Sequence, residues 1–176
     1  MSTQSRIPSP RQQGFTLIEL ACALVIMLLL LKGSLTLFND LLPHQRLVSD
    51  SNQLLGLLQE ARQLALSGQQ VLVCAEGTDC SHFPVSQGAM LVIDSNHNFT
   101  RDSGESIARQ LHLQDHERLT WHSFRNRPYL AYRSNGLSYF QNGHLLLCTP
   151  KEASKVVVNW IGRPRVEQAN LSACSS

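Results

Sequence analysis

The residues with the most specific chemistry lie near the C-terminus, where Gly162, Arg163, Pro164 and Arg165 follow one another. Proline disfavours the α conformation at the preceding residue, and in an extended chain residues two apart face the same side. The two guanidinium groups are therefore expected to project together from a stiff loop. Because arginine binds phosphate oxygens through paired hydrogen bonds, this spacing predicts contacts with successive phosphates. The alternative is a turn whose arginines pair with acids of a neighbouring subunit.

Other basic residues could widen this site, because positive charge is concentrated in the C-terminal third. Residues 118–176 carry eight basic and two acidic side chains, a net charge of +6, whereas residues 15–117 have a net charge of −6. A basic surface attracts polyanions, although the same count also fits a solvated face. The candidates for a wider patch are Lys155, Arg133, Lys151, Arg125 and Arg127.

A second group of polar residues partly matches a calcium-binding loop. Oxygen-bearing side chains stand at positions 1, 3, 5, 9 and 12 of the EF-hand pattern, at Asp94, Asn96, Asn98, Asp102 and Glu105. Phe99 occupies the position that the pattern reserves for glycine. We therefore expect an Asx-rich turn in preference to a calcium site.

No pattern in the sequence indicates catalysis. His112 and His116 have the spacing of helical metal ligands but lack an obvious third ligand, so a solvated surface stretch is expected. Nucleophile motifs, phosphate-binding glycine loops and paired catalytic carboxylates are missing from the sequence. We therefore expect neither an enzyme nor a cofactor.

The N-terminal segment contains an apolar run, which bears on whether the chain has a membrane anchor. Leu20–Leu31 is an uncharged, almost wholly aliphatic run of twelve residues, short for a membrane span of about 20. A span would have to include Phe15 to Ile18 and would bring Glu19 into the bilayer, which is costly unless a cation pairs with it. Cleavage between Gly14 and Phe15 would create such a cation, the new amine of a neighbouring copy. A cleaved secretory signal is the alternative, but no small-residue cleavage site follows the run.

The composition predicts one long helix from Phe15 to about Ser67, which includes the apolar run. Its later half has a single apolar stripe made of Leu47, Leu54, Leu58, Ala61 and Ala65. This half is expected to pack on a domain. Pro43 should kink or loosen the helix, and Gly68 is a natural end.

After Gly68 the pattern changes to short β-branched or aliphatic runs separated by turn residues. The runs that we interpret as strands are 70–75, 89–93, 119–123, 129–132, 144–148 and 155–160. A long helix laid on an antiparallel sheet made of such strands predicts the α+β class.

Residues 14–19, Gly-Phe-Thr-Leu-Ile-Glu, resemble the type III signal of type IV pilins and of the pseudopilins of type II secretion. The resemblance implies cleavage after Gly14 by a prepilin peptidase, N-methylation of Phe15, and Glu19 as the carboxylate used in assembly. Gln13 stands at a position where such leaders often carry a basic residue, and Arg11 could supply the positive charge instead.

The resemblance also implies a pilin fold and a topology. Residues 1–14 would be the leader peptide, 15–38 the transmembrane and assembly helix, and 39–176 a periplasmic domain. The protein would be a single-pass protein of the inner membrane, assembled with other pilins or pseudopilins into a filament.

Several later segments narrow the resemblance to the GspH/FimT family of minor pilins. They are 71–74 with Cys80, 88–94, Asp102–Glu105, 142–148 and 156–165. In FimT-type proteins a C-terminal GRxR sequence belongs to a DNA-binding loop, and Gly162, Arg163 and Arg165 match it. Pro164 at the variable position and Phe99 in the acidic turn are departures.

The resemblance implies a minor pilin at or near the tip of a type IV pilus, which binds double-stranded DNA without sequence preference during natural transformation. One alternative is a GspH-type pseudopilin of a type II secretion system. Another is a minor pilin for assembly or adhesion that does not bind DNA.

Four cysteines of the domain, Cys74, Cys80, Cys148 and Cys174, allow three pairings, whereas Cys22 lies in the apolar run. We favour Cys74 with Cys80, which closes a small loop, and Cys148 with Cys174, which ties down the C-terminal tail. A zinc site is the rival, but the spacing is poor for zinc. Export would favour the oxidised form.

Overall fold

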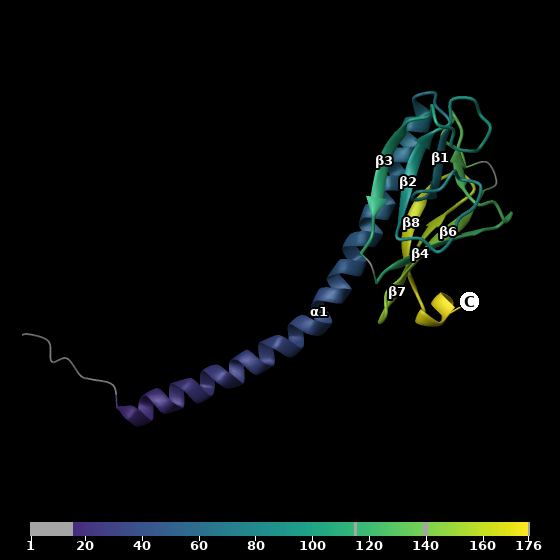
Figure 1. Ribbon diagram of the computed structural model, residues 1–176. Helices are drawn as coiled ribbons and strands as arrows, with labels where there is room; N and C mark the ends of the chain where they lie inside the picture. Colours follow the sequence, from purple (N-terminus) through teal and green to yellow (C-terminus); the bar gives the residue numbers. More distant parts are fainter. Residues whose placement is uncertain (1–15, 115, 139–140, 176) are drawn as a thin grey trace, which may run out of the picture. The chain divides into compact units, whose positions relative to one another are not determined.

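The computed structural model describes residues 16–114, 116–138 and 141–175. Figure 1 shows one long helix followed by short strands. In chain order, the elements are α1 Leu17–Leu66, β1 Val71–Ala75, β2 Gly88–Ile93, β3 Ile107–His112, β4 Arg118–Ser123, β5 Leu130–Tyr132, β6 Gly143–Cys148, β7 Ala153–Val158, β8 Pro164–Ala169 and the 3-10 helix η1 Leu171–Ser175. The predicted α+β class is confirmed.

Local signals explain both ends of α1. The Thr16 hydroxyl accepts a hydrogen bond from the Glu19 backbone nitrogen at 3.3 Å, so Thr16 is the N-cap. At the other end Gly68 has φ +101°, a conformation in which glycine is favoured after a helix. The helix is continuous through Pro43, and its predicted end near Ser67 is confirmed.

The chain divides into two compact units. The first unit ends at Leu41 and the second runs from Leu42 to Ser176. In the first, the side chains of Leu17, Ile18, Leu20 and the run 24–31 are each more than half exposed. Within the described residues we find no helix with the length and apolar character needed to cross a membrane.

The second unit contains two antiparallel sheets of four strands each. Sheet A has the order β3-β2-β1-β5, and sheet B has the order β4-β6-β7-β8. β3, β5, β4 and β8 are thus edge strands. Pro164 begins β8, where a residue without a backbone N–H donor is tolerated because the strand is an edge.

The part of α1 in the second unit packs on both sheets. The predicted apolar stripe is confirmed, since Leu47, Leu54, Leu58, Ala61 and Ala65 are all buried. They contact inward-facing residues of both sheets, among them Val73 of sheet A and Leu145 of sheet B. Figure 1 shows this part of α1 alongside the strands. Both sheets are therefore held on a single helix face.

Sheet A is also covered on its other face. Alternate residues of β1, Leu72 and Cys74, turn away from α1 into a second cluster with Met90, Tyr129 and Phe99. All five residues of β1 are consequently buried. The second cluster anchors the loops that follow β1 and β2.

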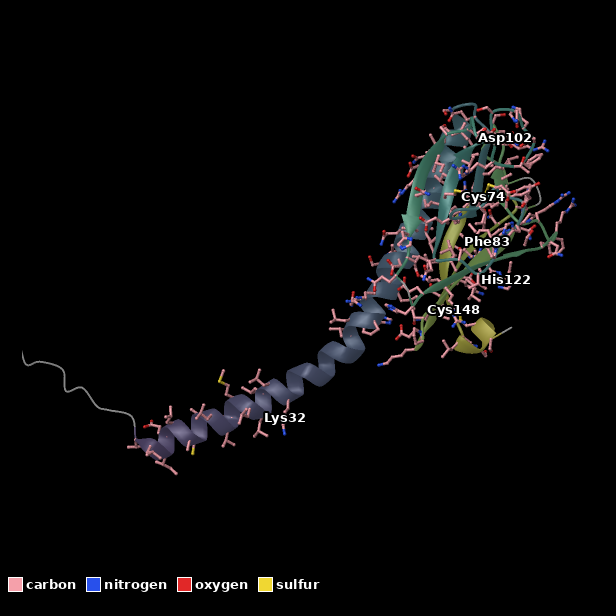
Figure 2. The ribbon with its side chains drawn as sticks, viewed as in Figure 1. Lys32, Cys74, Phe83, Asp102, His122 and Cys148 are labelled. Carbon is pink, nitrogen blue, oxygen red and sulfur yellow. A yellow bond between two sulfur atoms is a disulfide. The ribbon has the colours of Figure 1, made fainter. Side chains whose placement is uncertain are left out.

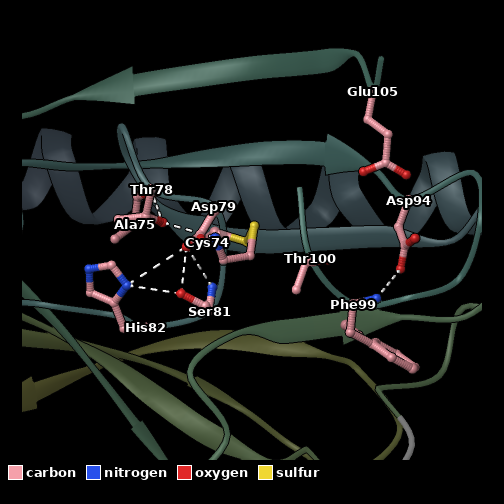
Figure 3. Close-up of a disulfide and its surroundings, with 12 residues drawn as sticks. Cys74, Ala75, Thr78, Asp79, Ser81, His82, Asp94, Phe99, Thr100 and Glu105 are labelled. Carbon is pink, nitrogen blue, oxygen red and sulfur yellow. Dashed lines mark hydrogen bonds and ion pairs between the residues drawn. A yellow bond between two sulfur atoms is a disulfide. The ribbon is translucent and has the colours of Figure 1, made fainter. Parts of the chain in front are cut away.

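Both favoured disulfides are confirmed. Cys74 pairs with Cys80 beside the loop after β1 (Figure 3), and Cys148 at the end of β6 pairs with Cys174 in η1. The first closes a short turn, and the second fastens the tail to sheet B. Cys22 is free and exposed.

Glu117, just before β4, is a buried carboxyl group. Its residue is 1% exposed, and burial, followed by the charge of Asp50, raises its pKa above the ordinary value of 4.5. The folded protein thus keeps a proton that the unfolded chain has lost, so stability falls as the pH rises from 4.5 through the folded-state pKa.

We expect Glu117→Gln to raise the melting temperature at neutral pH, because it removes the cost of ionising this group in the folded state. The gain should vanish at a pH below 4.5, where Glu117 is protonated in both states. Thermal unfolding of the two proteins across this range measures the effect. A difference that stays constant with pH would contradict the explanation.

Candidate functional site

The predicted arginine loop is the connection between β7 and β8. The Gly162 backbone nitrogen donates to the Asn159 carbonyl oxygen at 2.9 Å, and the Arg163 backbone nitrogen donates to the Asn159 side-chain oxygen at 2.8 Å. These bonds close a tight turn at the end of sheet B. Arg163 lies in the turn, and Arg165 lies inside β8, where the sequence had predicted loop.

Residues from the end of β5 onward brace this turn. The Tyr132 hydroxyl donates to the Gly162 carbonyl oxygen at 3.2 Å, and burial raises the pKa of Tyr132, so it remains a donor. The Ser138 hydroxyl lies 3.0 Å from the Asn159 carbonyl oxygen and 3.1 Å from that of Trp160. Gly162 has φ +77° and is buried. The turn is therefore held rigidly from one side.

Arg163 and Arg165 are both exposed but line different hollows. Arg163 lines a hollow of about 330 Å³ with α1 residues, including Arg62. Arg165 lines a groove of about 520 Å³ on the face of sheet B turned away from α1, which we call the outer face. The two arginines thus offer separate anion contacts at one end of the sheet, instead of the single joint projection that the sequence predicted.

The surroundings of the two guanidinium groups also differ. No hydrogen bond or ion pair joins the Arg163 guanidinium to another described residue. The Arg165 Nε atom donates to Glu167 at 2.6 Å, and Lys155 reaches the other oxygen of the same carboxylate at 3.0 Å. Hydrogen bonds from Lys155 and Arg165 lower the pKa of Glu167. Glu167 thus fixes two cations on the outer face and neutralises one of their charges.

The remaining basic candidates are only partly brought together. Arg133 follows β5, in the turn whose Gly136 carbonyl oxygen accepts from Arg62 Nε at 3.1 Å. Arg125 and Arg127 lie in the loop after β4, whose backbone nitrogens donate to the Ser123 hydroxyl at 3.3 and 3.2 Å. Lys151 lies in the turn between β6 and β7, at the opposite end of sheet B, and so does not join the arginine turn.

The strand order separates the two oppositely charged parts of the sequence. All four strands of sheet B come from residues 118–176, whereas three of the four strands of sheet A come from the acidic part. The positive charge of the C-terminal third is thus concentrated on sheet B and its loops. Such a field favours polyanions.

Three groups at this end of sheet B were not singled out from the sequence. Arg62 stands in the acidic half of the chain, and only its packing places it beside Arg163. His122 and His144 stack across two strands with ring centroids 5.0 Å apart. The third group is a pair of exposed aromatic residues, Phe124 and Trp160. The register of β4 and β6 pairs the two histidines, and the loops after β4 and β7 bring the two aromatic residues to one groove.

The acidic loop after β2 is an Asx-rich turn, as predicted. The buried Asp94 carboxylate accepts from the backbone nitrogens of Asn98 and Phe99 at 3.1 and 3.0 Å, the latter shown in Figure 3. Asp102 accepts from the side chains of Asn96 and Asn98, both at 2.7 Å. Phe99 takes the left-handed conformation, with φ +64°, and stacks on Tyr129. Both oxygens of Asp94 and one oxygen of Asp102 are thus engaged within the protein.

The other expected metal candidates behave as surface residues. His112 ends β3 and contacts Glu76 at 2.9 Å, and His116 lies in the following loop. Among the residues that the structure describes, no three or more His, Cys, Asp or Glu side chains gather as metal ligands would. The chemistry that the arginine turn and the neighbouring outer face of sheet B offer is therefore anion binding through arginines.

Gly14 and Phe15 fall outside the described residues, and Glu19 lies in the first turn of α1. Their predicted roles in cleavage, methylation and assembly stay predictions.

Comparison with known proteins adds a family and a fold. The family model described as type II transport protein GspH matches residues 50–162, and the prokaryotic N-terminal methylation motif matches residues 9–31. The solved structure of the type IV minor pilin FimU from Pseudomonas aeruginosa is similar, with 16% identity and a TM-score of 0.50 over 74% of this chain and 92% of that one. This likeness confirms the predicted pilin fold. We found no match among curated proteins.

Proposed function

Since the chain belongs to the GspH family, whose model matches more than half of it, we propose that it is a minor pilin of a type IV pilus that binds DNA through Arg163 and Arg165. The pilin fold and the methylation motif support a structural role in a filament rather than an enzymatic one. FimU, whose fold it shares, is a type IV minor pilin, which favours the pilus over a secretion filament.

Assembly would use the N-terminal unit. Prepilin peptidase would cut after Gly14, and the amine of Phe15 would be methylated. The exposed apolar side chains of residues 17–31 would first lie in the inner membrane, with the β-rich domain in the periplasm. They would then pack against other pilins at or near the filament tip, because a continuous apolar surface of this kind is stable only when covered.

DNA binding rests on one observation, the exposed and braced arginine turn. The Arg163 guanidinium has no hydrogen-bond or ion-pair partner among the described residues, and Arg165 is held in place by Glu167. Such groups can bind successive phosphates without a large loss of conformational freedom. Phosphate contacts carry no sequence information, so binding would be independent of sequence and weakened by salt. The family match ends at Gly162, so this role rests on the arginines themselves.

We expect Arg163→Ala/Arg165→Ala to lower the affinity for duplex DNA about 10-fold near physiological salt, and to reduce the slope of log affinity against log salt by about 1.8 for two lost phosphate contacts. A gel-shift titration of the full chain in detergent measures both effects. Arg46→Ala/Arg109→Ala, on α1 and β3, makes the same change in net charge and should leave the affinity nearly unchanged. Equal binding by the wild type and the turn variant would remove DNA from the proposed function.

The description of the matching family as type II transport protein GspH supports a second candidate, a minor pseudopilin of a type II secretion system. In that role the arginine turn would contact acidic side chains of a neighbouring subunit. A minor pilin for assembly or adhesion without DNA binding is the third. Cross-linking in the native host separates the secretion candidate from the two pilus candidates, because the captured neighbours are either secretion components or minor pilins. The gel-shift titration separates the two pilus candidates.

A further inference from the structure

The outer face of sheet B carries a groove that the arginine turn only borders. In register across the four strands, His122 faces His144, His144 faces Val157, and Val157 faces Arg165. This row forms the floor of the groove of about 520 Å³ described above; His122 is labelled in Figure 2. A hollow of this size falls within the usual range for small-molecule and nucleotide sites.

Exposed aromatic rings border this row. Phe124, after β4, is 78% exposed, and Trp160, after β7, is 60% exposed, and both line the groove. By contrast, the other tryptophan, Trp121, packs against the core. Stacking on a flat ligand stabilises aromatic side chains that are otherwise exposed to solvent. The two rings therefore indicate a ligand with π faces.

Both rings stand on loops that the fold holds in place. Trp121 Nε1 donates to the Arg127 carbonyl oxygen at 3.0 Å, which ties the loop carrying Phe124 to sheet B. The Trp160 carbonyl oxygen accepts from the Ser138 hydroxyl at 3.1 Å. A surface ordered before binding loses little entropy when a ligand arrives.

The charges around the groove select an anion. Two cations on this face are Arg165 and Lys155, and the acid beside them, Glu167, is already paired with both. Burial, then the charges of His122 and Lys155, lower the pKa of His144, while Glu167 opposes them. The half-buried His144 is thus a neutral ring at neutral pH, and the cations lie at the β8 side of the groove.

We propose that this groove binds unpaired nucleotides of a DNA strand, with phosphates at the Arg165 end and bases against Trp160 and Phe124. The proposal rests on the proposed DNA binding and extends it, because a duplex hides the faces of its bases and can use only the arginines. Single-stranded segments or frayed ends would therefore be bound more tightly than blunt duplex at equal charge.

The test compares oligonucleotides on the full chain in detergent by fluorescence anisotropy. The probes are a single strand of about 16 nucleotides, its blunt duplex, and the same strand without bases. Phe124→Ala/Trp160→Ala should bind the single strand at least about 10-fold more weakly, the loss expected when base stacking is removed. Its affinity for the duplex and for the base-free strand should change less than about 2-fold. Val85→Ala/Leu171→Ala, which removes exposed apolar side chains outside the groove, is the control.

The outcomes separate the two proposals. If the aromatic variant keeps its affinity for the single strand, or loses equal affinity for single strand and duplex, the groove does not bind bases. The proposal that the arginine turn binds DNA is unaffected by either result. If the arginine variant binds duplex DNA like the wild type, the arginine turn is not a DNA-binding site. The groove proposal still holds in that case, provided that the aromatic variant has a lower affinity for the single strand.

Discussion

Gly162→Ala is expected to lower the free energy of unfolding by about 3 kcal/mol. A residue with a side chain costs about 1–2 kcal/mol in the left-handed conformation that Gly162 adopts, with φ +77°. Its new Cβ atom would also lie 2.8 Å from Tyr132 Cε1 and 2.9 Å from the Gly136 carbonyl oxygen, and such overpacking costs about 1–3 kcal/mol more. Urea unfolding followed by circular dichroism measures the change.

Two other glycines separate these two causes. Gly68 also has positive φ, but nothing lies within 4 Å of the place that a Cβ atom would take, so Gly68→Ala should cost about 1 kcal/mol, the conformational part alone. Gly56, inside α1, has open space and helical φ, so Gly56→Ala should stabilise by about 1 kcal/mol. Equal losses for Gly162→Ala and Gly68→Ala would show that the contacts with Tyr132 and Gly136 do not matter.

The same variant also links the fold to the proposed function. Tyr132 and Ser138 hold the arginine turn in place. If this contact orders the turn, a substitution at Gly162 that displaces the turn should weaken DNA binding even though both arginines remain. We therefore expect Gly162→Ala to lose affinity for duplex DNA, whereas Gly68→Ala should not.

The main elements could be predicted from the sequence because their buried residues form either a helical stripe or a continuous apolar run. The stripe from Leu47 to Ala65 predicted the packed half of α1, and buried runs such as 71–75 and 89–93 predicted the inner strands. Two edge strands were missed. β3 buries one residue, Leu111, and β8 buries none. Without a continuous apolar run, the sequence carries no clear signal for either strand.

The site was predictable only where neighbours in sequence are neighbours in space. Gly162, Arg163 and Arg165 were found because they are contiguous. Arg62 was not, because 101 positions separate it from Arg163 and only the packing of α1 brings them to one hollow. The predicted joint projection of the two arginines was wrong because Arg165 enters β8, so its direction is set by the pleat of the sheet.

Glu19→Gln is expected to remove the protein almost wholly from the filament. In the proposed assembly the carboxylate pairs with the Phe15 amine of a neighbouring subunit in an apolar surrounding. An uncompensated charge there costs about 3 kcal/mol or more, which corresponds to a loss of roughly 100-fold in incorporation. Immunoblotting of sheared filaments against the membrane fraction in the native host measures this ratio.

The chemistry of the first turn of α1 supplies the matched control. Thr16 and Glu19 have the spacing of a capping box, in which glutamine serves at the second position as well as glutamate. Glu19→Gln therefore removes the charge while keeping the local helix start, and Thr16→Ala removes the cap while keeping the charge. If the charge is what assembly requires, Thr16→Ala enters the filament and Glu19→Gln does not. The reverse pattern would assign Glu19 to the helix start alone, and would leave the amine of Phe15 without its proposed partner.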